Sequence, residues 1–165
     1  MATKLDHALV RELRESTKKT DADLKAIKAI IDSDVLRVAN NLAGSIDSAD
    51  VACGRSLSRI AKRCEAGIES RAERAARVRV DLSDDRVNQA DARRIRGLAH
   101  DSETCRVTLM GLTASLDHLA LTAKRTSVKE GCAIMAADIK KMSEAACERI
   151  DADIRAIDAV LGAIA

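Results

Sequence analysis

Apolar residues in the first half of the chain recur at spacings of three, four and four residues between Leu24 and Ile68. This is an eleven-residue period, about 3.67 residues per turn, and it predicts helices that pack together nearly straight or with slight right-handed winding. No useful length of the sequence alternates apolar and polar residues with the period of a strand. The pattern therefore predicts an all-α fold.

The second half carries a similar stripe, with a one-residue change of phase in the segment AKRTSVKE at residues 123–130. Together the two stripes predict a packing seam, meaning the residues that the helices bury against one another. The predicted seam consists of Leu24, Ile27, Ile31, Val35, Val38, Leu42, Ile46, Cys53, Leu57, Ile60, Cys64, Ile68, Leu98, Cys105, Leu109, Leu112, Leu116, Met135, Ile139, Met142, Ile150, Ile154, Ile157 and Leu161.

Three segments interrupt the helical pattern and predict turns near residues 44, 83 and 126. In the first, Gly44 is expected to end a helix in the left-handed conformation that glycine adopts without strain. In the second, Ser83 is expected to cap a helix whose first turn carries two aspartates. In the third, Ser127 and Glu130 have the spacing of a capping box.

These turns predict an antiparallel, coiled-coil-like four-helix bundle that forms one domain over residues 1–165. Its four segments run over residues 2–43, 46–81, 84–124 and 127–164. The unbroken apolar phase across the first turn supports an alternative, a long two-arm helical hairpin that turns only near residue 83. The Cα atoms of Ile31 and Leu57 should lie about 10 Å apart in the bundle but about 39 Å apart in the hairpin.

The composition fits thin helical packing, because the chain has no Phe, Tyr, Trp or Pro, while apolar residues make up 47% of it and charged residues 33%. A core without aromatic side chains consists of small aliphatic layers, and this predicts association between copies. The N-terminus lacks an apolar signal-peptide core, and the apolar C-terminal stretch at residues 156–165 is too short to span a bilayer. We therefore expect a cytoplasmic protein that does not span a membrane.

Five cysteines are present, an odd number without any CxxC pair. This pattern is untypical of a zinc site or a secreted disulfide framework, so it predicts reduced thiols and neither a metal nor another cofactor. The five are Cys53, Cys64, Cys105, Cys132 and Cys147. In the expected register Cys64 and Cys105 approach each other, with their Cα atoms within about 10 Å.

One short motif suggests chemistry, the sequence His-Asp-x-x-Thr at His100, Asp101 and Thr104. It resembles the phosphoacceptor box of histidine-kinase dimerisation domains, in which the acidic neighbour assists the histidine and the threonine serves phosphatase chemistry. The resemblance covers about five residues, and Cys105 replaces the proline that often follows the threonine. It implies a phosphotransfer role for His100, whereas a surface histidine on a polar helix face is the simpler interpretation.

A second cluster is basic and surrounds the central turn. It comprises Arg71, Arg74, Arg77, Arg79, Arg86, Arg93, Arg94 and Arg96. Such a basic tip suits a phosphate-rich partner, but acidic residues are interleaved with it and no aromatic side chain is available to stack on bases. With a net charge of only +2, nucleic acid is an unlikely partner, and a solvated, ion-paired face is the simpler interpretation.

The sequence thus predicts a non-enzymatic structural or interaction protein that self-associates through its helical seams. It gives no indication of a small-molecule substrate, since Walker, GxGxxG, GxSxG and HExxH motifs are all missing. One alternative is a phosphotransfer or signalling bundle that uses His100. The other is an amphipathic coat protein on a lipid or granule surface.

Overall fold

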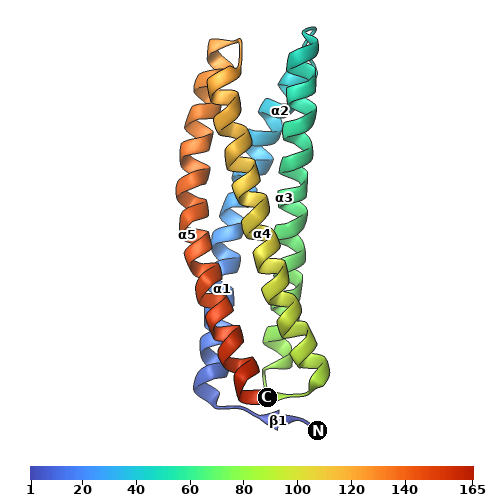
Figure 1. Cartoon of the computed structure of the whole chain (residues 1–165), viewed down its shortest axis with the longest axis vertical. Helices are drawn as coiled ribbons and strands as arrows, with labels where there is room; N and C mark the ends of the chain where they lie inside the picture. The colour runs from blue at the N-terminus through green and yellow to red at the C-terminus, as the bar shows by residue number, and fades with distance from the viewer.

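The computed structural model describes residues 1–165 as four long helical rods that run up, down, up and down (Figure 1). The helical elements are α1 (His7–Ile30), a π-helical turn η1 (Ile31–Val35), α2 (Leu36–Ala43), α3 (Ser48–Asp81), α4 (Gln89–Thr122) and α5 (Thr126–Ile164). The first rod consists of α1, η1 and α2 in succession, and each later helix forms one rod. Two short strands, β1 (Thr3–Lys4) and β2 (Arg86–Val87), pair antiparallel.

The four-helix bundle is confirmed, and the two-arm hairpin is not formed. The chain leaves the helix after Ala43 and enters α3 at Ser48, so the segment around Gly44 is a corner. The first and third turns lie at the same end of the molecule (Figure 1), where Lys124 Nζ lies 3.2 Å from Asp47 Oδ2. No helix is both long enough and apolar enough to cross a membrane.

Buried positions in the last three rods repeat every seven residues rather than every eleven. In α3 they alternate at spacings of three and four, and α4 and α5 follow the same rule. The α3 positions are Gly54, Leu57, Ala61, Cys64, Ile68, Arg71, Ala75 and Val78. A heptad repeat is the pattern of left-handed coiled-coil packing, so the predicted eleven-residue period is wrong for these helices.

Most of the predicted packing seam is buried, with seven exceptions. Ile46 is fully exposed, because the helix ends before it and the corner carries it into solvent. The other six are only partly buried, and each lies directly beside the residue that the heptad buries. They are Val38, Cys53, Ile60, Met142, Ile154 and Leu161, beside Ala39, Gly54, Ala61, Ser143, Asp153 and Val160. In each pair the sequence pattern indicates the larger apolar residue, but the structure buries its smaller or polar neighbour.

The π-helical turn η1 explains the shift in the first rod. From Ile31 the heptad would next bury residues 34 and 38, but the buried residues are Val35 and Ala39. A π-helix bonds residue i to i+5, so its turn holds one extra residue and moves every later position by one. Because of this extra residue, Val35 and Ala39, rather than residues 34 and 38, face the core.

The corner uses its glycines differently from the prediction. Gly44 has a φ of −87°, so the expected left-handed conformation is wrong, and the turn is closed instead by Asp47, whose carboxylate caps the start of α3. The glycine that the fold requires is Gly54. A β-carbon there would lie 2.5 Å from Ala43 N and 2.6 Å from Ala39 O, so α3 approaches the backbone of α2 too closely for any side chain.

The lower turn also differs from the prediction at Ser83, which caps no helix. After α3 ends at Asp81, the chain passes through Asp85 in the left-handed region, with a φ of 58°, and through β2. The cap of α4 is Asn88, which forms a reciprocal capping box with Asp91 through two bonds of 2.9 Å. A capping residue five positions later than expected therefore starts the third rod.

The capping box predicted at Ser127 and Glu130 is wrong as well. Arg125 occupies the N-cap position of α5 without a side-chain cap, and Ser127 lies inside the first turn. Arg125 instead reaches across the upper end, where its Nη2 lies 3.4 Å from Asp50 Oδ2. The loops at this end are tied to each other by ion pairs rather than by a capping box.

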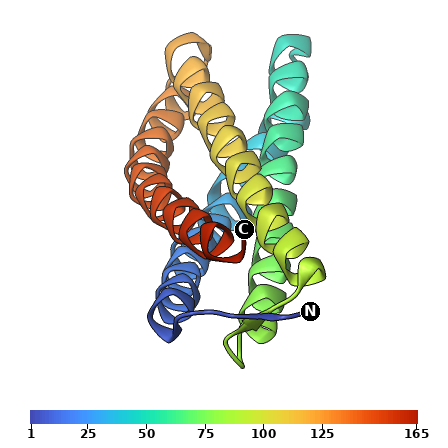
Figure 2. The ribbon, with the colours of Figure 1, turned by 60° about the horizontal axis from the view of Figure 1, so that its bottom comes forward.

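The core consists of two apolar clusters, an upper one of 21 buried residues and a lower one of 13. Ile31 and Leu57 both belong to the upper cluster, as a corner at residue 44 requires, and so do Cys64 and Cys105. The N-terminal segment crosses the lower end of the bundle (Figure 2) and places Leu5 over the lower cluster. Polar side chains occupy the level between the clusters.

Candidate functional site

The most polar part of the interior centres on Arg71 of α3. Its side chain is fully buried, although arginine almost never is unless it is paired. Arg71 Nη2 donates to Asp153 Oδ2 of α5 over 2.5 Å, and Nη1 donates to Asp21 of α1. Arg71 Nε donates to Ser102 Oγ of α4 over 3.2 Å. All four rods therefore meet at one guanidinium.

Further contacts complete this arrangement. We call it the polar layer, and it consists of Ser16, Asp21, Arg71, Arg79, Ser102 and Asp153. Ser16 Oγ donates to Asp153 Oδ1 over 2.5 Å, and Arg79 Nη1 donates to Asp21 Oδ2 over 2.8 Å. Two arginines and two aspartates balance in charge, and every guanidinium nitrogen of Arg71 has a partner.

The polar layer is better suited to fix the axial positions of the four rods than to catalyse a reaction. Two charges removed from water cost several kcal/mol, and their attraction repays that cost only when the geometry satisfies both ions. Here the geometry does so at a single vertical position of the four rods, because a shift of any rod along its axis separates Arg71 from its carboxylates. Its groups are committed to one another rather than presented to a substrate.

Sequence reasoning missed the polar layer, although a signal existed. Its sequence neighbours place Arg71 in the basic tip, yet it follows Cys64 and Ile68 at heptad spacing and so falls on the buried stripe. Asp153 and Ser102 likewise fall on the buried stripes of α5 and α4. Heptad counting through polar residues, rather than between apolar ones only, would have found all three.

The rest of the basic tip is ion-paired in part. Three further arginines have carboxylate partners: Arg74 with Asp101, Arg79 with Asp21, and Arg94 with both Asp81 and Asp91. The remaining arginines of the cluster, Arg77, Arg86, Arg93 and Arg96, are exposed. The charge available to a phosphate-rich partner is therefore smaller than eight arginines suggest.

His100 lies exposed on α4, as the sequence predicted, but Asp101 and Thr104 form hydrogen bonds with other groups. Asp101 Oδ2 accepts a hydrogen bond of 2.6 Å from Arg74 Nε. The Thr104 hydroxyl donates to the His100 backbone carbonyl over 3.1 Å. The acidic group expected to assist phosphotransfer is thus bound to an arginine, and the phosphotransfer role stays a prediction.

A pair of carboxyl groups meets where η1 packs on α3. Burial, followed by the neighbouring Asp32 carboxyl, raises the pKa of Glu65 to about 7. The hydrogen bond with Glu65 lowers the pKa of Asp32, and Lys28 adds to that effect. Lys28 Nζ also bridges Asp32 and Glu69, at 3.3 Å and 3.2 Å. A carboxyl group with a pKa of about 7 is the chemistry that this cluster offers.

The cysteines are all free, and three of them are buried. Burial raises the pKa of Cys64 to about 11 and that of Cys105 to about 12. A thiol protonated to that degree is a poor nucleophile and metal ligand, so these two act as small apolar side chains. No three His, Cys, Asp or Glu side chains are placed together so as to hold a metal ion.

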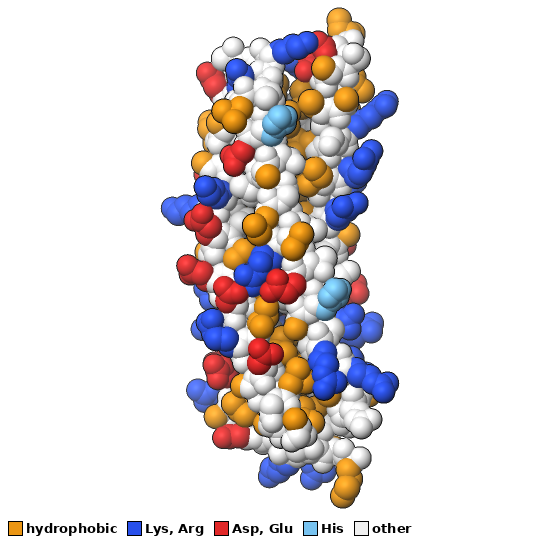
Figure 3. All heavy atoms as spheres, in the orientation of Figure 1, with side chains coloured by type: hydrophobic (Ala, Val, Ile, Leu, Met, Phe, Trp, Pro, Cys, Tyr) orange, Lys and Arg blue, Asp and Glu red, His pale blue; other side chains and the backbone are white.

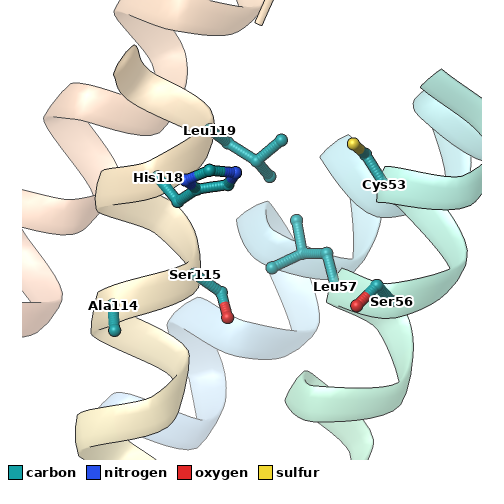
Figure 4. A pocket seen from close by; sticks show the side chains of 7 residues that line it. All are labelled: Cys53, Ser56, Leu57, Ala114, Ser115, His118 and Leu119. Atoms are coloured by element: carbon teal, nitrogen blue, oxygen red, sulfur yellow. The ribbon is translucent and has the colours of Figure 1, made fainter. Parts of the chain in front are cut away.

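Two surface grooves flank α4. The first, of about 280 Å³, lies between α3 and α4 and is shown in Figure 4. Leu57 and Leu119 point into it, while His118 and Cys53 lie on opposite walls (Figure 4). The separation of these two side chains across the groove argues against a Cys-His nucleophilic pair.

The second groove, which we call the α4–α5 groove, is larger, at about 460 Å³. Its lining is Arg106, Met110, Thr113, Ala114 and Asp117 of α4 with Lys140, Ser143, Glu144 and Cys147 of α5. The lining combines apolar side chains with two cations and two anions. Such a groove can bind another molecule through apolar contacts and ion pairs together.

Comparison with known proteins gives no further guidance, because no family model, no curated protein and no solved structure matches this chain.

Proposed function

We propose that this chain is a non-enzymatic structural or interaction protein that associates with itself through its outer helical faces. The observation that carries the proposal is the exposure of large apolar side chains on α4 and α5, outside the buried core. Val107, Met110 and Leu121 of α4 and Ile134 of α5 are each at least 63% exposed. Figure 3 views the side that α4 faces, where apolar side chains run between charged ones.

The spacing of these residues supports an interface rather than scattered exposure. Val107, Ala114 and Leu121 recur every seven residues on the outermost line of α4, with Met110 beside them. Such a line is a second apolar stripe, opposite to the one that packs inside the bundle. A monomer derives no stability from it, whereas a second helix laid along it buries its apolar area.

The interior supports a structural role in a different way. The buried ionisable groups of the polar layer are consumed in holding the four rods in register. The protein is therefore proposed to act through its surface, in the cytoplasm, without catalysing a reaction.

Sedimentation velocity over a concentration range from about 0.1 to 100 µM tests the proposal, because standard protein interfaces have dissociation constants in or below this range. We expect the mass to rise from that of one chain to a defined multiple of it. A single-chain mass at every concentration would show that the exposed stripe has another use.

A further inference from the structure

The geometry of the α4–α5 groove specifies the partner. We infer that two copies of this chain pair face to face across this groove, with their α4 helices antiparallel and a twofold axis level with Gly111. The inference rests on the proposed self-association and adds its surface, its orientation and its charge pairs.

The groove contains polar atoms that the single chain does not satisfy. Of the four buried side-chain atoms without a hydrogen-bond partner, Ser143 Oγ and Arg106 Nε both belong to residues that line it. Ser143 is only 8% exposed, and another nitrogen of Arg106 is already bound to Asp151 over 2.5 Å. Buried polar groups are rarely left unpaired, so a molecule that covers the groove and offers acceptors is expected.

The α4 wall of the groove is complementary to itself when reversed. Arg106 and Asp117 stand at its two ends, eleven residues or about 16 Å apart, and their midpoint falls between Gly111 and Leu112. A twofold axis at that midpoint places Arg106 opposite the partner's Asp117, and the reverse pair follows by symmetry. The same axis places Met110 opposite the partner's Thr113, which also lines the groove.

The register between α4 and α5 fixes the level of the same axis on the α5 wall. Ser102 and Asp153 bind one guanidinium and therefore lie level on their antiparallel helices. Leu112 lies ten residues after Ser102, so it is level with Ser143, which lies ten residues before Asp153.

An axis level with the midpoint of Gly111 and Leu112 is level with the midpoint of Ser143 and Glu144 on α5. The twofold therefore sets Glu144 opposite the partner's Ser143, whose hydroxyl has no hydrogen-bond partner within its own chain, and Lys140 opposite the partner's Cys147. Opposite charges across the axis on α4 and a carboxylate facing a hydroxyl on α5 favour an isologous pair of identical chains.

The charge of the groove also selects a second copy over an anionic partner. Two cations and two anions line the groove, so nucleic acid or an anionic membrane gains no net attraction there. Met110 in the groove and Val107 beside it on α4 are 63% and 65% exposed, and they supply the apolar contacts that a helix interface needs.

The first part of the test measures dimer dissociation by sedimentation velocity for Met110→Glu and for a matched control, Val80→Glu. Val80 is 71% exposed on α3, away from the groove. We expect Met110→Glu to weaken dimerisation about tenfold or more, as loss of a central apolar contact does, and Val80→Glu to leave it within about twofold. Far-UV circular dichroism checks that both variants remain folded.

The second part tests the orientation by a charge swap on α4. Asp117→Arg places an arginine against the partner's Arg106 across the axis and should weaken the dimer about threefold to tenfold. The combined swap, Arg106→Asp with Asp117→Arg, restores opposite charges across the axis and should recover the wild-type dissociation constant within about twofold.

The outcomes separate this inference from the proposed function. An oligomer that Met110→Glu does not weaken, or a charge swap that fails to rescue Asp117→Arg, overturns the groove interface but leaves self-association in place. A single-chain mass at all concentrations overturns both. If that monomer bound anionic phosphatidylserine vesicles and Met110→Glu abolished the binding, the occupant of the groove would be a lipid surface, contrary to the inference.

Discussion

The two apolar clusters on either side of Arg71 are held together by different means. The lower cluster lies between the polar layer above it and the β1–β2 strands below it, so directional contacts fix it at both levels. The upper cluster depends on the close fit of aliphatic side chains and on the approach of two backbones at Gly54. The lower part thus fixes the axial positions of the rods relative to one another, and the upper part fixes the distance between their helices.

The largest effect should come from breaking the polar layer at Asp153. Asp153→Ala leaves the buried Arg71 with one carboxylate fewer, and removal of one partner from a buried ion pair costs about 3–5 kcal/mol. Urea unfolding followed by circular dichroism measures the change. Asp158→Ala, at an exposed position on the same helix, is the control and should change the free energy of unfolding by less than about 0.5 kcal/mol.

A double variant separates the stability of the polar layer from its role in register. Arg71→Met with Asp153→Leu replaces the ion pair by apolar side chains of similar volume, which is often neutral or stabilising. We expect it to regain most of the stability that Asp153→Ala loses. If the register of the rods depends on the pair, the double variant should also show broadened amide resonances. Amide resonances of the double variant as sharp as those of the wild type would argue against that role.

The helices, their number and their approximate turns could be predicted because apolar periodicity and turn residues are local signals. The heptad phase could not, because small or polar residues such as Gly54, Ala61 and Asp153 hold core positions beside larger apolar neighbours. The π-helical turn added a second error, since its extra residue has no distinct sequence signature and shifts the phase after Ile31. Wherever the core residue has a small or polar side chain, the sequence pattern therefore indicates its larger apolar neighbour instead.

Packing in the upper part predicts a contrast between two glycines. Gly54→Ala introduces a β-carbon 2.5 Å from Ala43 N, which forces α2 and α3 apart and should destabilise the fold by about 1–3 kcal/mol. Gly44→Ala meets its nearest atom, Asn40 O, at 3.5 Å and has an ordinary negative φ, so it should stabilise by about 0.5 kcal/mol. Thermal and urea unfolding of both variants measure the contrast. Equal destabilisation by both would mean that the corner is strained at Gly44 after all.

The smallest effect should appear in the pH dependence of stability near η1. Because the pKa of Glu65 is about 7 in the folded state and 4.5 ordinarily, the folded state holds a proton that the unfolded state has released. The free energy of unfolding should therefore fall as pH rises from about 4.5 to about 7. Glu65 is only partly buried, and solvent screens the pair, so we expect a contribution below about 1 kcal/mol.

Glu65→Gln removes this titration and should flatten the stability profile in that pH window. The variant should be more stable than wild type at pH 8, where the wild-type carboxylate faces Asp32 with both groups charged. Glu73→Gln, at an exposed position two turns further along α3, is the control. An unchanged slope in Glu65→Gln would show that the two carboxyls do not share a proton.

The candidate sites were harder to predict than the fold, because each depends on contacts between distant parts of the chain. Nothing local marks Asp21, Ser102 and Asp153 as partners of one arginine. The α4–α5 groove joins residues of two helices whose level is set by those partners, so its charge pattern becomes visible only in the folded bundle. His100 shows the converse, since its motif is local but its assisting aspartate is held by Arg74.

The most direct test of self-association through the α4 face follows the methionine methyl resonances during dilution. The chain has four methionines, Met1, Met110, Met135 and Met142, of which Met135 is buried and Met142 half-buried. With methyl-labelled protein, diluted from about 200 to 1 µM across the range of ordinary dimer affinities, we predict a shift for Met110 and none for Met1 or Met135. A Met110 resonance that stays constant throughout, while the protein stays folded, would contradict the account.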